Sequence, residues 1–76
     1  MASDPTPPLD PERWVDDYAD YLYRFAVARV RHHEVARDLV QETFLGALKA
    51  RDRYAGRAAE RTWLTGILKN KIVDNY

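Results

Sequence analysis

The chain of 76 residues contains no cysteine, and its 12 basic and 12 acidic residues give a formal net charge of zero. A chain of this length forms one domain that buries about 60% of its unfolded surface, enough for a small helical core but not for a deep enzyme cleft. Without cysteine, disulfide bonds and thiolate metal sites are excluded. Because the sequence also lacks a membrane-length apolar run and a signal-peptide pattern, we expect a soluble, cytoplasmic protein.

The zero net charge hides an asymmetry along the chain. Residues 1–20 contain six acidic residues and one basic residue, a net charge of −5, whereas residues 21–76 contain eleven basic and six acidic residues, a net charge of +5. Such segregation is typical of proteins that contact nucleic acid with one part of their surface. Since an excess of +5 is modest, we expect the domain alone to bind DNA weakly.

The first eleven residues contain all four prolines and few apolar side chains. This composition predicts a disordered tail over residues 1–11 and a helical domain over residues 12–76. Asp10 and Pro11 form a helix-start signal, a capping acceptor followed by proline at the first helical position. A long amphipathic helix is then expected to end near Arg31, because apolar side chains recur at helical spacing: Trp14, Tyr18, Tyr21, Leu22 and Phe25.

Two patterns in this first half resemble chemical sites. Asp16 and Asp20 lie one helical turn apart, as a catalytic carboxylate pair would, but the helix dipole and solvation explain early helical acids more simply. His32 and His33 point about 100° apart and have no histidine at i+4, so a turn between helices explains them better than a metal site. We therefore expect that the protein is not an enzyme and that it binds neither a metal ion nor another cofactor.

A second helix is expected from about Glu34 to Ala50. Its core side consists of small and apolar residues, with Phe44 at the flank: Ala36, Val40, Thr43 and Ala47. Its opposite face carries two leucines among polar side chains: Asp38, Gln41, Glu42, Leu45 and Leu48. Although single exposed leucines are common, leucine bracketed by carboxylates and an amide is typical of a helix-docking surface.

A basic, glycine-containing connection over residues 51–61 leads to a third helix from about Arg61. Its apolar stripe has helical spacing: Leu64, Ile67, Leu68 and Ile72. Trp63, Gly66 and Asn70 fall together beside this stripe, which would place an aromatic surface next to an amide. Five cations lead into the helix: Lys49, Arg51, Arg53, Arg57 and Arg61. Cations beside an aromatic platform suit single-stranded nucleic acid, and the alternative is a tryptophan that only covers the core edge.

The order of these motifs resembles the second conserved region of bacterial RNA polymerase sigma factors, in particular the small extracytoplasmic-function (ECF) type. The motifs are Asp38-Leu-Val-Gln-Glu-Thr-Phe-Leu-Gly-Ala-Leu, Tyr54-Ala-Gly, Thr62-Trp-Leu-Thr-Gly-Ile and Asn70, within a resemblance that covers roughly residues 18–76. The resemblance implies an all-α, three-helix domain. The family normally continues to a second, −35-binding domain; because the chain ends with the helical pattern still running, we expect an isolated domain without it.

The resemblance also implies two partners. Core RNA polymerase would bind the second helix through the clamp helices of its β′ subunit, with Asp38, Gln41 and Glu42 at the polar positions and Leu45 and Leu48 at the apolar centre. Promoter DNA would bind the loop, which captures a base flipped out of the non-template strand of the −10 element, and the third helix, which recognises and melts that element. No membrane partner is expected, and an anti-sigma factor stays open as a third partner.

The residues expected to contact DNA lie in the loop and the third helix: Arg53, Tyr54, Gly56, Arg57, Glu60, Arg61, Thr62, Trp63, Gly66, Lys69, Asn70 and Lys71. Two features depart from the family pattern. Primary sigma factors tend to have two adjacent aromatic residues where this chain has Trp63 and Leu64, and Glu60 stands where an aromatic residue would make a more obvious base pocket. The base identity at the promoter therefore stays open, and the alternative function is a helical protein–protein interaction module without DNA binding.

Overall fold

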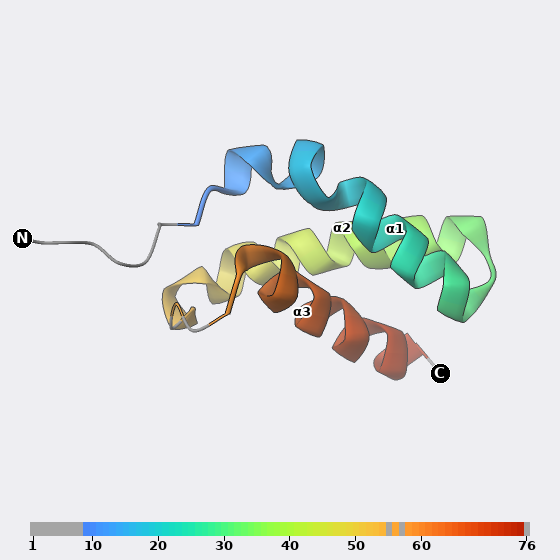
Figure 1. Ribbon diagram of the computed structural model, residues 1–76. Helices are drawn as coiled ribbons and strands as arrows, with labels where there is room; N and C mark the ends of the chain where they lie inside the picture. Colours follow the sequence, from blue (N-terminus) through green and yellow to red (C-terminus); the bar gives the residue numbers. More distant parts are fainter. Residues whose placement is uncertain (1–8, 55, 57, 76) are drawn as a thin grey trace, which may run out of the picture.

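Three helices form the domain, shown in Figure 1: α1 (Trp14–Val30), α2 (His33–Ala50) and α3 (Glu60–Asn75). Two short 3-10 helices flank them, η1 (Pro11–Arg13) before α1 and η2 (Arg51–Arg53) after α2. The computed structural model describes residues 9–54, 56 and 58–75, and this part of the chain contains no β-strand. The predicted all-α, three-helix architecture is therefore confirmed. Within the described residues, no helix has the length and apolarity needed to cross a membrane.

The helices alternate in direction, so that α1 and α3 run roughly parallel and α2 runs opposite to both (Figure 1). The start of α3 lies beside the start of α1, where Glu60 bonds to Trp14, and Lys69 farther along α3 lies near Phe25. The segment that connects α2 to α3 is therefore at the same end of the molecule as η1. This arrangement places the loop before α3 next to the first turns of α1.

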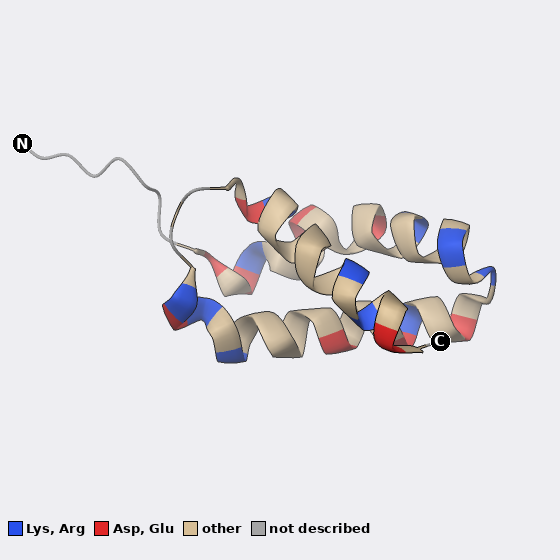
Figure 2. Cartoon of the chain, turned by 90° about the horizontal axis from the view of Figure 1, so that it is seen from below, with Lys and Arg blue, Asp and Glu red and all other residues tan. Residues whose placement is uncertain are grey.

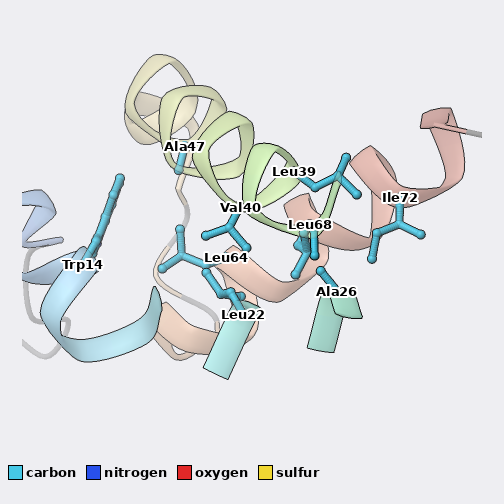
Figure 3. Close-up of a cluster of buried hydrophobic side chains, with 10 residues drawn as sticks. Trp14, Leu22, Ala26, Leu39, Val40, Ala47, Leu64, Leu68 and Ile72 are labelled. Carbon is cyan, nitrogen blue, oxygen red and sulfur yellow. The ribbon is translucent and has the colours of Figure 1, made fainter. Parts of the chain in front are cut away.

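One apolar core holds the three helices together, as Figure 3 shows. Its largest fully buried apolar side chains are Trp14, Leu22, Leu64 and Leu68. Full burial of a leucine-sized side chain stabilises the fold by about 1.5–3 kcal/mol. The predicted core side of α2 is confirmed, since Ala36, Val40, Thr43 and Ala47 are all buried. Ala26 and Leu39 are also buried, although the sequence patterns did not single them out.

The turn between α1 and α2 follows from the conformation of two residues. Arg31 ends α1 in the left-handed region, with φ of 56°, and its N–H donates to the carbonyl of Val27 at 2.8 Å. His32 then caps α2, because its Nδ1 accepts a hydrogen bond from the N–H of Val35 at 3.3 Å. The prediction of a turn at the two histidines is thus confirmed, with α2 beginning at His33.

The start of the domain differs from the sequence prediction. Pro11 begins the 3-10 helix η1 instead of an α-helix, and the Asp10 side chain makes no capping hydrogen bond. Leu9 packs against the core, and the Asp10 N–H donates to Glu60 at 2.8 Å. Ordered structure therefore reaches back to Leu9, three residues before the predicted domain boundary, because these two residues have partners that composition does not reveal. The rest of the predicted tail, residues 1–8, lies outside the described residues.

Candidate functional site

The outer face of α2 brings together all five residues that the sequence predicted for protein docking: Asp38, Gln41, Glu42, Leu45 and Leu48. All are exposed, including Leu45 at 58% and Leu48 at 39%. They occupy the side of the helix opposite its buried residues, as the periodicity of 100° per residue requires. The face therefore presents an apolar centre with a polar border, an arrangement that favours contact with another helix.

The loop between η2 and α3 is closed by its own contacts. The hydroxyl of Tyr54 donates to the carbonyl of Ala58, which spans the loop. Gly56 has φ of 76°, a left-handed conformation that glycine adopts without steric cost. Arg53 is exposed at the entry to the loop, whereas the predicted DNA contact Arg57 lies outside the described residues.

A row of aromatic rings joins the loop to the core. Tyr54 lies 5.1 Å from Trp63 between ring centroids, Trp63 lies 6.2 Å from Trp14, and Trp14 lies 6.2 Å from Phe44. Trp63 is consequently half-buried and contacts the loop, whereas Gly66 and Asn70 of the same predicted surface are exposed. The tryptophan thus both covers the core edge and supports the loop.

Glu60, the first residue of α3, faces α1. Its carboxylate accepts hydrogen bonds from Trp14 Nε1 at 2.7 Å, from the Tyr18 hydroxyl at 3.0 Å and from the Asp10 N–H at 2.8 Å. Burial of Tyr18, together with its hydrogen bond to Glu60, raises the pKa of the phenol because both disfavour the phenolate. Three donors therefore engage the carboxylate that the sequence analysis placed among the DNA contacts.

The remaining candidates on α3 divide between two sides of the helix. On the side toward α1, the Arg61 guanidinium lies 4.9 Å from the Tyr21 ring centroid and Lys69 Nζ lies 5.9 Å from that of Phe25. On the side toward α2, Lys71 is half-buried against Gly46, where an added Cβ would lie 3.6 Å from Lys71 Cε. The structure therefore does not gather all predicted DNA contacts on one surface.

Thr62, Gly66 and Asn70 of α3 are exposed. A Cβ added at Gly66 would meet no atom within 4 Å, so packing inside the domain does not require glycine there. Figure 2 shows where the charged positions of the chain lie, and those at the end of α2 and in η2 are mostly basic: Lys49, Arg51 and Arg53, with one acid, Asp52. The described residues contain no group of three or more histidine, cysteine, aspartate or glutamate side chains that could hold a metal ion.

The sequence model of the family described as Sigma-70 region 2 matches residues 14–76, a span that includes all three helices and the loop. The chain belongs to the sigma-70 region 2 family. The matched region 2 domain includes both the outer face of α2 and the exposed side of α3. No solved structure matches it significantly.

Curated relatives are consistent with the ECF type. The chain is 46% identical to a probable RNA polymerase sigma factor of Haemophilus influenzae over 70% of its own length and 27% of the relative. It is 32% identical to the ECF RNA polymerase sigma factor SigX of Bacillus subtilis, over 78% of the chain and 30% of the relative. It is 34% identical to the ECF RNA polymerase sigma factor BldN of Streptomyces coelicolor, over 84% and 25%. The region 2 domain thus spans less than a third of the length of each of these three relatives.

Two residues of α1 lie beside the candidate DNA residues of this region 2 domain, although the sequence analysis assigned them only to an apolar helix face. Tyr21 is 40% exposed and lies beneath Arg61, and Phe25 is half-buried near Lys69. The sequence contains one signal that distinguishes Tyr21 and Phe25 from the core residues of α1. They are spaced i and i+4 and form a separate row along the helix, beside the row formed by Trp14, Tyr18 and Leu22.

Proposed function

We propose that this domain acts in transcription initiation, as the part of a sigma factor that binds core RNA polymerase and the −10 promoter element. The observation that carries the proposal is the family match over residues 14–76, because it covers both candidate surfaces in one alignment. Three relatives that are named as RNA polymerase sigma factors support it. In this proposal the domain performs no covalent chemistry.

The outer face of α2 is the proposed polymerase-binding surface, with the clamp helices of the β′ subunit as its partner. Leu45 and Leu48 gain most from such an interface, because their exposed apolar area leaves water when a partner helix covers it. Asp38, Gln41 and Glu42 at the border would fix the register through hydrogen bonds and charge.

The loop and α3 are the proposed DNA-binding surface. Arg53, Arg61 and Lys69 would neutralise phosphates, whose contacts position the strand but carry no sequence information. Asn70 is the proposed base-reading residue on α3, since an amide can bond to a base edge. Trp63 would hold the upstream edge of the melted region from its place beneath the loop. Melting then follows from binding energy, because capture of an unstacked base offsets the few kcal/mol of unpairing.

Glu60 has a supporting role in this proposal, because its carboxylate already accepts three hydrogen bonds within the domain. It fastens the start of α3, and with it the end of the loop, to α1. Base capture would therefore depend on the loop backbone and on neighbouring aromatic side chains.

The polymerase half of the proposal is tested by binding to a β′ clamp-helix fragment, measured by calorimetry. We expect Leu45→Arg, Asp38→Ala and Gln41→Ala to weaken binding, by about 1–2 kcal/mol or more for residues at the centre of the interface. Val73→Ala, at an exposed valine on α3, is the matched control and should bind as the unchanged domain does. Unchanged affinity in all three α2 variants, with helix content preserved, would exclude this face as the docking site.

A further inference from the structure

A groove of about 360 Å³ lies between α1 and α3, and neither Trp63 nor any described residue of the loop lines it. Tyr21 and Phe25 form its α1 wall, and Arg61, Thr62, Gly66 and Lys69 line its α3 side. We propose that this groove binds a nucleotide of the same DNA single strand, with the base stacked on Tyr21 and the flanking phosphates on Arg61 and Lys69. The inference rests on the proposed function and extends its binding surface to α1.

Tyr21 offers the stacking face. Its side chain is 40% exposed, while the neighbouring Phe25 ring is already covered by the Arg29 guanidinium at 3.6 Å. The Arg61 guanidinium lies over the Tyr21 ring at 4.9 Å, and this cation–π contact is weak because both residues are exposed to water. A base can therefore take the place of the guanidinium on the ring, because stacking on an aromatic side chain is available to any base.

The cations are spaced for more than one phosphate. Arg61 and Lys69 are eight residues apart, or roughly 12 Å along α3 at a rise of 1.5 Å per residue. Gly66 lies between them, and the space where its Cβ would be is open to at least 4 Å. A nucleic-acid backbone can thus approach the helix closely at Gly66, and the other side chains between the two charges that line the groove are the small hydroxyl residues Thr62 and Thr65.

The composition of the groove favours a nucleic-acid strand over other partners. None of the side chains that line it is acidic, whereas the groove between α1 and α2 includes both Asp20 and Arg37. An acidic peptide would use the cations but would leave the aromatic wall without a partner. A strand uses both, since phosphates bind the charges and a base covers the ring.

The test is a fluorescence-anisotropy titration of the domain with a labelled −10 non-template strand and with a strand of equal length that carries abasic sites. Tyr21→Leu removes the ring but keeps an apolar side chain, and Tyr21→Phe keeps the ring. We expect Tyr21→Leu to weaken binding of the base-containing strand by about 5- to 150-fold, the range for loss of one stacked base. It should leave binding of the abasic strand unchanged, and Tyr21→Phe should bind both strands as the unchanged domain does.

Matched controls separate the groove from the rest of the surface. Val15→Ala, at an exposed residue elsewhere on α1, should change neither affinity. The assignment is overturned if Tyr21→Leu binds the intact strand with normal affinity, or if the substitution weakens binding of the intact and abasic strands equally. It is also overturned if an acidic peptide displaces the strand and Tyr21→Leu weakens binding of that peptide to the same extent. If the domain still prefers −10 sequences in those cases, the proposed function stands and only the groove assignment fails. If the domain binds no single strand at low salt, both the groove assignment and the proposed function fail.

Discussion

Glu60 shows how one side chain can connect three parts of the domain. Its carboxylate holds the indole N–H of the fully buried Trp14, the hydroxyl of Tyr18 and the backbone N–H of Asp10. Removal of such an acceptor leaves a buried donor without a partner, which costs more than the net value of the hydrogen bond. The start of α3 and the end of the loop before it therefore depend on this contact with α1.

This dependence predicts different effects for two substitutions at Glu60. Glu60→Ala should lower the free energy of unfolding by about 1–3 kcal/mol, because the Trp14 N–H is left buried and unpaired. Glu60→Gln should cost much less, since an amide oxygen can accept from Trp14 and the amide N–H₂ can donate to the Tyr18 oxygen. Urea unfolding followed by circular dichroism measures both values. Equal losses in the two variants would show that the charge, and not the hydrogen bonds, matters.

Tyr18 predicts how stability depends on alkaline pH. Its pKa is raised in the folded domain by burial and by the hydrogen bond to Glu60, relative to an unfolded value of about 10. The associated stability is therefore fully present below about pH 10 and is lost as pH rises through the folded pKa. Urea titrations between pH 8 and 11 should show the advantage of the unchanged domain over Tyr18→Phe shrinking above pH 10. A constant difference over this range would contradict the linkage.

At the scale of elements, the turn between α1 and α2 carries a local cost. Arg31 adopts φ of 56° although it has a Cβ, whereas glycine is the usual residue at such a helix end. Arg31→Gly should therefore raise the free energy of unfolding by about 0.5–1 kcal/mol, even after the larger unfolded-state entropy of glycine. Thermal unfolding checks this, with Arg31→Ala as control. A gain for alanine equal to that for glycine would place the effect in the arginine side chain instead.

Helix periodicity predicted the elements well because α1, α2 and α3 each bury one face. The core side and the exposed side of α2 were both predicted from spacing alone, and α3 begins at Glu60, one residue before its expected start. Periodicity assigns a residue to a face but does not identify its neighbour. Leu39 is buried at the flank of α2 because adjacent helices cover that flank, and this depends on how the helices pack.

The candidate site was less predictable because its important contacts are distant in the sequence. Glu60 bonds to residues 42 to 50 positions away, so the pattern around it gave no sign that its carboxylate faces α1. Trp63 was placed beside Gly66 by helical spacing, but its packing against Tyr54 depends on the path of the loop. The contact of Tyr21 with Arg61 likewise requires the parallel packing of α1 and α3.

At the scale of the whole molecule, the two proposed binding surfaces use different sets of residues. Leu45 is on the outer face of α2, whereas Lys69 faces the groove between α1 and α3. Substitutions at sites without shared partners act independently. Leu45→Arg should therefore weaken clamp-helix binding without changing affinity for a single strand. Lys69→Ala should weaken single-strand binding without changing affinity for the clamp helices. Calorimetry with each ligand tests this, and loss of both activities in either folded variant would show that the surfaces overlap.

The proposed phosphate contacts predict that DNA binding by the domain weakens as the salt concentration rises. Each phosphate contact contributes about 0.7 to the slope of log affinity against log salt for a single strand. Lys69→Ala should flatten this slope by about that amount and weaken cognate and scrambled strands by a similar factor, because phosphates carry no sequence information. A variant that lost discrimination between the two strands would place Lys69 among the base-reading residues.

The central claim is that this domain reads the −10 element on a single strand. It is tested most directly by titrating the unchanged domain and Asn70→Ala with cognate and scrambled non-template strands at two salt concentrations. The account predicts that the domain prefers the cognate strand and that Asn70→Ala reduces this preference by roughly 1–3 kcal/mol, the value of good base-edge hydrogen bonds, while changing affinity for the scrambled strand little. If the unchanged domain binds both strands equally at both salt concentrations, it does not read bases and the account is contradicted.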